Sequence, residues 1–141
     1  MSLIKNLLLT IIALFLFFPL TIINLIYVWL KGRNDLYNTV SGYFFSTALN
    51  IDKFANSEFR GLWNRILIKQ NINVFKFGNP NETISYCLGK NKETSNLSKV
   101  GEFLCEILNF IEKDHVEKTV ILTENKNKTI SDKNKNKKSR K

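Results

Sequence analysis

The most constraining feature of this sequence is an uninterrupted apolar run near its N-terminus. Between Lys5 and Lys31 there are 25 consecutive uncharged residues, and seventeen of residues 7–30 are Leu, Ile, Phe or Val. A helix of this length measures about 37 Å, enough to cross a hydrocarbon core about 30 Å thick with some tilt. Its side chains favour insertion by about 5–10 kcal/mol, an upper bound because residues near the ends contribute less. The run therefore predicts a membrane-spanning helix and a lipid bilayer as partner.

Five residues mark the predicted span along its length: Leu7, Leu14, Pro19, Ile23 and Leu30. Pro19 lies near the centre, where it removes one backbone hydrogen bond and is expected to kink the helix. A cleaved signal peptide is the main alternative, but its apolar region has roughly 7–15 residues and ends at a small-residue cleavage site. This run is longer and has no such site, so we expect an uncleaved anchor. A buried soluble helix, the third alternative, would seldom be apolar on all sides over this length.

The C-terminal end of the run has the composition of a membrane exit. Tyr27 and Trp29 are followed closely by Lys31 and Arg33. Aromatic and then basic side chains are typical of a chain that leaves the hydrocarbon through the headgroup layer. Because this end carries slightly more positive charge than the N-terminal end, the positive-inside rule places the C-terminal domain in the cytoplasm.

The rest of the chain predicts a mainly α fold in three parts. They are the transmembrane anchor (residues 1–31), a small helical domain (residues 32–123) and a disordered Lys/Asn-rich tail (residues 124–141). Apolar residues at helical spacing predict helix over residues 36–62 and again over 59–69. Residues 72–77 are expected to be a short extended piece, and residues 120–122 either a last strand or a frayed end.

Capping signals predict two further helices. Asn79 fits an N-cap, Pro80 the first helical position and Glu82 the third, so the first helix should cover residues 80–88 and end at Gly89. A polar loop should follow over residues 90–96. Ser98 can cap the second helix. The predicted buried face of that helix consists of Val100, Phe103, Leu104, Ile107, Leu108 and Ile111.

A bulky apolar patch follows the predicted membrane exit. It consists of Tyr43, Phe44 and Phe45, in a segment too short for a second span because Asp52 and Lys53 end it. One interpretation is a core face of the domain. The other is a helix that lies in the membrane interface with its aromatic side chains in lipid. Both remain open from the sequence.

Seven short segments of the body stand out together. They are GYFF at residues 42–45, ALNIDKFAN at 48–56, LIK at 67–69, FGNPNETIS at 77–85, LGKN at 88–91, LSKVG at 97–101 and IEKDHVEK at 111–118. This pattern, which covers about half of the chain, resembles small membrane-anchored proteins encoded by tailed bacteriophages and prophages. The resemblance implies a phage or prophage context at the host inner membrane. It implies no specific activity, and the Lys-rich tail lies outside it.

The sequence offers few groups for catalysis. His115 is the single histidine, and its predicted place at a helix C-terminus favours a capping role over nucleophile activation. Cys87 and Cys105 form no C-x-x-C pair, so we expect free thiols, with one disulfide if the compartment is oxidising. Their irregular spacing from His115 disfavours zinc.

Paired catalytic carboxylates are not indicated either. Glu58, Glu82 and Glu102 are expected on helix surfaces or at caps, which does not suit the two-carboxylate cleft of a membrane-tethered lysozyme. The sequence contains neither a phosphate-binding loop nor a dinucleotide fingerprint. We therefore predict no enzyme activity and no cofactor or metal site.

The C-terminal tail carries most of the net charge of +9. Its basic residues include Lys133, Lys135, Lys137, Lys138, Arg140 and Lys141. Near an anionic membrane each contributes up to about 1 kcal/mol of attraction. The tail lacks aromatic residues for base stacking, which argues against nucleic acid as a partner. A solubilising tail is the other interpretation, and AT-rich codon bias explains part of its Lys/Asn content.

Taken together, these features predict a non-enzymatic, single-pass membrane protein of phage or prophage origin. Its helical domain would dock at the inner membrane, on a membrane protein or on a second copy of the chain. The two alternatives are a holin-like lysis protein and an adaptor or regulator of a host membrane complex, which would bind through residues 100–111.

Overall fold

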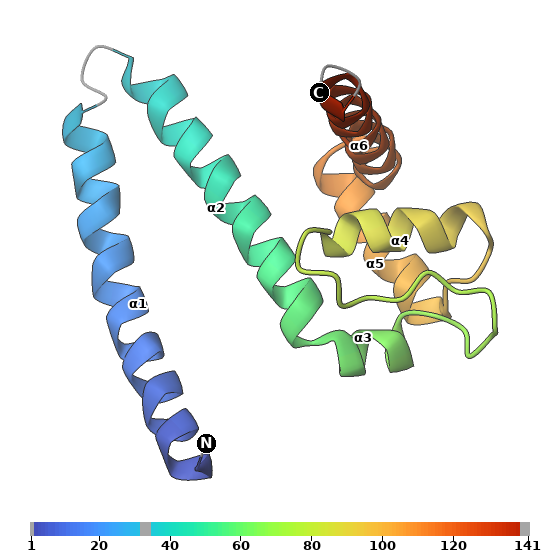
Figure 1. The fold of residues 1–141 in the computed structure, drawn as a ribbon, viewed down its shortest axis with the longest axis horizontal. Helices are drawn as coiled ribbons and strands as arrows, with labels where there is room; N and C mark the ends of the chain where they lie inside the picture. Colours follow the sequence, from blue (N-terminus) through green and yellow to red (C-terminus); the bar gives the residue numbers. More distant parts are fainter. Residues whose placement is uncertain (1, 32–34, 139–141) are drawn as a thin grey trace. The chain divides into compact units, whose positions relative to one another are not determined.

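A computed structural model describes residues 2–31 and 35–138, which form six helices (Figure 1). They are α1 (Leu3–Lys31), α2 (Leu36–Glu58), α3 (Arg60–Ile66), α4 (Ile84–Glu93), α5 (Lys99–Ile111) and α6 (His115–Lys138). The chain divides into two compact units, Met1–Ala48 and Leu49–Lys141, so the boundary falls within α2. The mainly α prediction is confirmed. In the described ranges the β-type pairing is one isolated antiparallel bridge, between Ile68 and Leu97.

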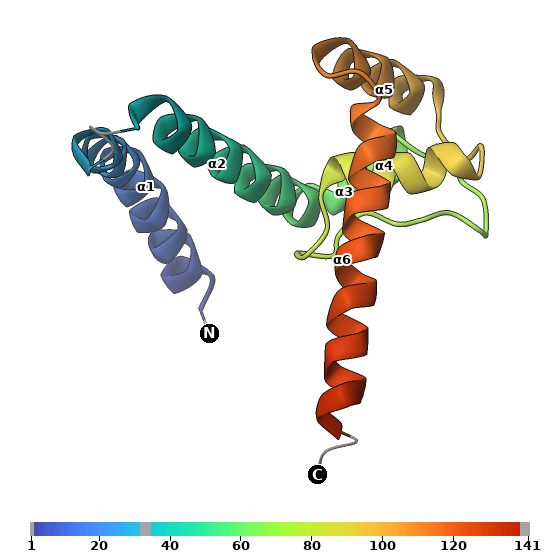
Figure 2. The ribbon, with the colours of Figure 1, turned by 90° about the horizontal axis from the view of Figure 1, so that it is seen from above.

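The second unit is built around α4, which contacts both α5 and α6 (Figure 2). Its buried cluster joins residues from α4, α5, α6 and the segment after α3: Leu67, Ile68, Phe77, Cys87, Leu88, Leu97, Cys105 and Val116. This is a small core. The unit therefore relies on polar side chains as well, since burial of so few apolar residues offsets only part of the chain entropy.

The predicted start and end of α4 are wrong. Thr83, in extended conformation, is the N-cap and its side chain accepts a hydrogen bond from the Tyr86 N–H. Asn79 instead closes a turn, because the Glu82 N–H donates to its carbonyl at 3.0 Å. Gly89 does not end the helix, which runs on to Glu93 through the predicted loop. It lies where α4 meets α6, and a Cβ there would stand 2.3 Å from Cγ2 of Val120.

Two asparagine side chains, Asn64 and Asn91, hold the irregular segment between α3 and α4. The Asn91 side chain, fully buried, accepts from the Phe75 N–H at 2.9 Å and donates to the Phe75 carbonyl at 2.7 Å. Asn64 makes the same pair of bonds with Phe77, at 2.8 and 2.9 Å. Each amide thus replaces the partners that a neighbouring strand would supply. Residues 72–77, predicted to be extended, therefore have irregular backbone and do not form a β-strand.

Asp52 joins α2 to the start of α4. Its carboxylate accepts from the Ile84 N–H at 2.9 Å and from the Ser85 hydroxyl at 3.2 Å. Burial raises the pKa of Asp52 above 3.8, although these hydrogen bonds favour the ionised form. The Ile84 N–H lies in the first turn of α4, where it has no partner within the helix, and Asp52 supplies one. The carboxylate also lies at the positive end of the α4 dipole.

The Ser98 cap is confirmed, since its hydroxyl accepts from the Gly101 N–H at 3.1 Å. A turn with Asp114 at φ 59° separates α5 from α6. Residues 120–122, predicted as a strand or a frayed end, belong to α6, and Val120 is buried. His115 begins α6 rather than ending α5, and its Nδ1 lies 2.8 Å from Oε2 of Glu112.

The described part of the tail continues α6 as helix to Lys138. All side chains from Asn125 to Lys133 are exposed, so no packing holds this stretch to the domain. The prediction that the tail lies outside the packed core agrees with this exposure. The helical conformation itself differs from the disordered chain that its composition predicts.

Candidate functional site

The first candidate site is α1, which is long and apolar enough to cross a membrane. Among the described residues it is the single helix that meets this condition, and none of its hydrophobic window is buried by the rest of the chain. Leu7, Leu14, Ile23 and Leu30 are exposed, and Pro19 lies inside the helix. An apolar helix that is exposed over most of its surface needs another apolar environment, which a bilayer supplies.

The two threonine hydroxyls of α1 are satisfied within the helix. The hydroxyls of Thr10 and Thr21 donate to the carbonyls of Asn6 and Phe17, at 2.9 and 2.7 Å. Such bonds lower the cost of placing a hydroxyl in hydrocarbon.

The predicted exit residues lie together where the structure describes them. Lys31 Nζ stands 5.8 Å from the centre of the Tyr27 ring, a cation–π contact, and Trp29 is exposed. Arg33 lies outside the described residues.

The predicted aromatic patch lies on α2. Tyr43 is half-buried and its ring meets that of Phe44 edge to face at 5.7 Å. Phe44 and Phe45 are exposed, at 55% and 73%. Neither phenylalanine is buried within the first unit, so their side chains remain available for lipid or protein.

The third candidate site is α5, where four of the six residues predicted to be buried are exposed. Leu104 and Leu108 are partly buried and pack on the core, as predicted. Val100, Phe103, Ile107 and Ile111 are exposed, and so is Phe110. We name these five residues the α5 stripe. The residues fully buried on α5 are Gly101 and Cys105.

The orientation of α5 follows from a close approach at Gly101. A Cβ at this position would lie 2.2 Å from the carbonyl oxygen of Leu67, a backbone atom. The helix therefore turns its glycine, and not its largest side chains, towards the segment after α3. Hydrophobic spacing alone could not reveal this, because glycine adds no apolar signal to the pattern.

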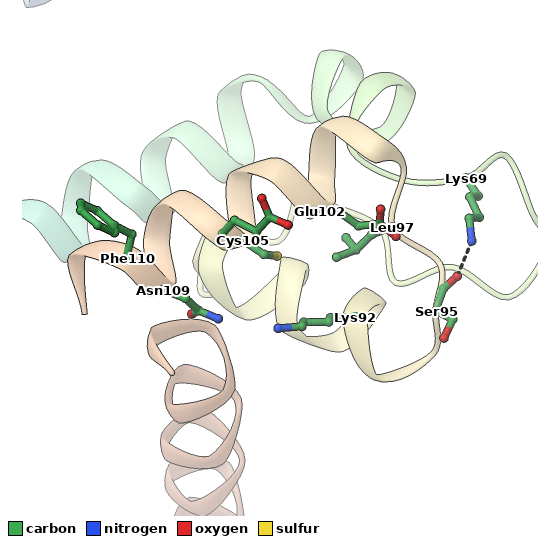
Figure 3. Close-up of a pocket in the computed structure, with 9 residues that line it drawn as sticks. Lys69, Lys92, Ser95, Leu97, Glu102, Cys105, Asn109 and Phe110 are labelled. Atoms are coloured by element: carbon green, nitrogen blue, oxygen red, sulfur yellow. Dashed lines mark hydrogen bonds between the residues drawn. The ribbon is translucent and has the colours of Figure 1, made fainter. Parts of the chain in front are cut away.

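A shallow hollow of about 590 Å³ adjoins the α5 stripe (Figure 3). Figure 3 shows Glu102, Cys105, Asn109 and Phe110 along α5, with Lys92 across from them. Lys92 pairs with Glu117, which lowers the pKa of that carboxylate. Glu102 and Glu106, by contrast, form no ion pair with any side chain that the structure describes. The hollow therefore presents two carboxylates, unpaired among those side chains, beside an exposed apolar stripe.

The two cysteines and the histidine are not paired with one another among the described residues. Burial raises the pKa of Cys105 to about 11 and that of Cys87 still further, so both thiols are protonated at neutral pH. Both cysteines are free, as the sequence predicts. The His115 ring contacts Glu112 and forms no hydrogen bond with either thiol in the described part of the chain. In the described part of the chain no three His, Cys, Asp or Glu side chains gather as metal ligands.

We predict that neither thiol reacts with Ellman's reagent in the folded protein at pH 8. The exposed fraction is 0% for Cys87 and 2% for Cys105, and the thiolate is scarce because both pKa values lie well above this pH. Two thiols per chain should react after unfolding in guanidinium chloride. Rapid reaction of either thiol before unfolding would contradict the burial described here.

The basic residues of the tail are described only in part. Lys133 is exposed at the surface of α6. Arg140 and Lys141 lie outside the described residues, as do the side chains of Lys135, Lys137 and Lys138. The predicted contact of these residues with anionic lipid stays a prediction.

The hollow beside α5 is the part of the site that the sequence does not reveal. Lys92, Glu106 and Asn109 come from two helices, and no motif links them. The phage resemblance also stays a prediction. No protein-family model matches the chain, and comparisons with curated proteins and solved structures found no match.

Proposed function

We propose that this chain is a non-enzymatic, single-pass membrane protein that uses α5 to dock its helical domain on a membrane protein partner. The exposed α5 stripe is the observation that carries the proposal. Single exposed apolar residues are common on soluble domains, but a contiguous stripe with bulky members such as Phe103 and Phe110 is typical of an interaction surface. Phe110 is 92% exposed in a domain whose core is formed without it.

The charge beside the stripe defines the partner's chemistry. Val100, Phe103, Ile107 and Phe110 follow the 3–4 spacing of a helix–helix seam. Glu102 and Glu106 border this seam without ion pairs of their own in the described ranges. An amphipathic helix with Lys or Arg beside its apolar face would complement both features. The acids disfavour anionic lipid as the occupant, because interfacial helices carry basic residues on their polar face.

The remaining parts of the proposal rest on the sequence. The resemblance supports a phage or prophage origin and the host inner membrane, and the charge balance around residues 5–33 supports a cytoplasmic domain. A holin-like role is the alternative. It gains no support from the second unit, since a holin needs little beyond its membrane segments and this unit has an organised core.

Replacement of two apolar residues of the α5 stripe by aspartate tests whether α5 binds the partner. In the full chain, purified in mild detergent from its natural host, Phe103→Asp with Ile107→Asp should abolish recovery of the partner. Two exposed side chains are changed, so the domain should stay folded, and far-UV circular dichroism checks this. The matched control is Lys99→Asp, which adds an acid on the same helix but outside the α5 stripe.

The expected result is a defined partner recovered with the wild-type chain and with Lys99→Asp but lost with the double variant. That partner should also carry a helix with basic residues beside an apolar face. Equal recovery with all three proteins, or recovery of the chain alone, would contradict docking through α5.

A further inference from the structure

A second periodic apolar stripe runs along α2. Six positions alternate in steps of three and four residues: Tyr37, Val40, Phe44, Thr47, Ile51 and Phe54. This is the a/d pattern of a coiled coil, and it continues over most of a 23-residue helix. We name these six positions the α2 seam. Glu58, at the next expected position, ends it.

Each part of the α2 seam is left uncovered by its own compact unit, residues 37–47 by the first unit and residues 51–54 by the second. Tyr37, Phe44, Ile51 and Phe54 are exposed at 83%, 55%, 52% and 62%, and Val40 and Thr47 are half-buried. No contact between α2 and another helix is extensive enough in the described residues to bury it. The exposed side chains are large and apolar, so water is an unfavourable environment for them.

Within the second unit, the C-terminal part of α2 makes polar contacts with the rest of the domain. Asn56, which is fully buried, donates to the carbonyls of Asn79 and Glu82, each at 2.9 Å. Asp52, one turn earlier, binds the start of α4. In the heptad, these two residues lie at positions f and b, which face away from a and d. These polar contacts hold the second unit against positions b and f of this part of α2 and leave Ile51 and Phe54 of the α2 seam exposed.

We propose that the α2 seam pairs with the same seam of a second copy, as a short parallel coiled coil. The positions that border it are uncharged: Ser41, Tyr43, Ala48, Asn50, Ala55 and Ser57. In a parallel homodimer each g residue faces the e residue of the partner's next heptad, so Tyr43 would face Ala48 and Asn50 would face Ala55. No like charges meet at these positions, which permits close approach of two identical helices. A hetero-partner selected by charge would need the opposite composition.

The parallel orientation rests on the proposed function. Copies anchored by α1 enter the bilayer in the same direction, so their α2 helices leave it side by side with the same polarity. A seam of six positions is short for association in water. Confinement to one membrane surface raises the effective concentration and compensates for the short length. The pairing partner is therefore a second copy of this chain, held in the same membrane.

Single cysteines along α2 test the pairing in membranes that contain the full chain. Phe44→Cys, Thr47→Cys, Ile51→Cys and Phe54→Cys place a thiol on the α2 seam, and Ser46→Cys, Leu49→Cys and Lys53→Cys are the matched controls. Oxidation with copper phenanthroline should give disulfide-linked dimers at all four seam positions and several-fold less at the controls. The wild-type chain is the negative control and should form no crosslinked dimer, because its two cysteines, Cys87 and Cys105, are buried.

Several outcomes would overturn the pairing. Crosslinks at a single seam position would indicate an antiparallel contact, and equal crosslinks at all positions would indicate random collision. If no position crosslinks and an impermeant maleimide labels the controls but not the seam cysteines, the α2 seam lies in lipid.

Alkaline extraction of the same variants tests the membrane anchor separately from the pairing. If alkaline extraction releases the variants from the membrane and the α2 seam positions still crosslink, anchoring by α1 is contradicted but pairing through α2 is not.

Discussion

Replacement of Leu14 and Phe18 together by arginine is expected to remove the protein from membranes. Each arginine near the centre of a span costs about 2.5–3.5 kcal/mol on insertion scales, and the lost apolar side chains remove about 1 kcal/mol more. The total of about 6–8 kcal/mol is similar to the whole insertion preference of the segment, about 5–10 kcal/mol. Both residues are exposed on α1, so neither contributes to the packed domain.

Flotation of cell lysates on a sucrose gradient measures this effect, since it separates membranes from aggregates as well as from soluble protein. Leu14→Ala with Phe18→Ala is the control, because it changes the same positions without adding charge. The control should float with the membranes and the double arginine variant should not. Flotation of both variants would mean that α1 is not what holds the chain to the membrane.

Gly101→Ala is expected to unfold the second unit or to destabilise it by about 3 kcal/mol, at the upper end of the cost of overpacking. The added Cβ would stand 2.2 Å from the Leu67 carbonyl oxygen. That oxygen cannot move freely, since it accepts from the Ser98 N–H at 3.0 Å. Urea unfolding of the purified chain in mild detergent, followed by Trp63 fluorescence in a Trp29→Phe background, measures the change in free energy.

Gly61→Ala is the matched control, a glycine in a helix with no atom within 4 Å of the added Cβ. Alanine should stabilise α3 there by roughly 0.5–1 kcal/mol, because it lowers the entropy of the unfolded chain. The two substitutions thus have opposite predicted signs. A similar, small effect of both would show that α5 does not approach the Leu67 carbonyl as closely as described.

The sequence predicted a helix cap correctly where the capping residue contacts only its neighbours in the chain. Ser98 caps α5 because its hydroxyl reaches an N–H three residues away, and this geometry needs no other part of the chain. The cap predicted at Asn79 failed because a distant residue competes for the same segment. Asn56 binds the carbonyls of Asn79 and Glu82, which holds the segment as a turn and moves the helix start to Thr83.

Tertiary packing also explains the other errors. Gly89 has the composition of a helix end, yet it is buried within α4 because α6 packs closely against it. The α5 helix is amphipathic as predicted, but the approach at Gly101 decides which of its apolar residues are buried. The acids and Lys92 around the hollow come from separate elements. Spacing within one helix cannot place residues that only the fold brings together.

Membrane anchoring is tested most directly by alkaline carbonate extraction of membranes from cells that express the unmodified full chain. Carbonate removes proteins that are bound to a membrane by charge or by protein contacts, whereas a helix such as α1, inserted in hydrocarbon, resists it. The protein should remain in the membrane pellet and should enter the supernatant after detergent is added. Release into the supernatant by carbonate alone would contradict anchoring by α1.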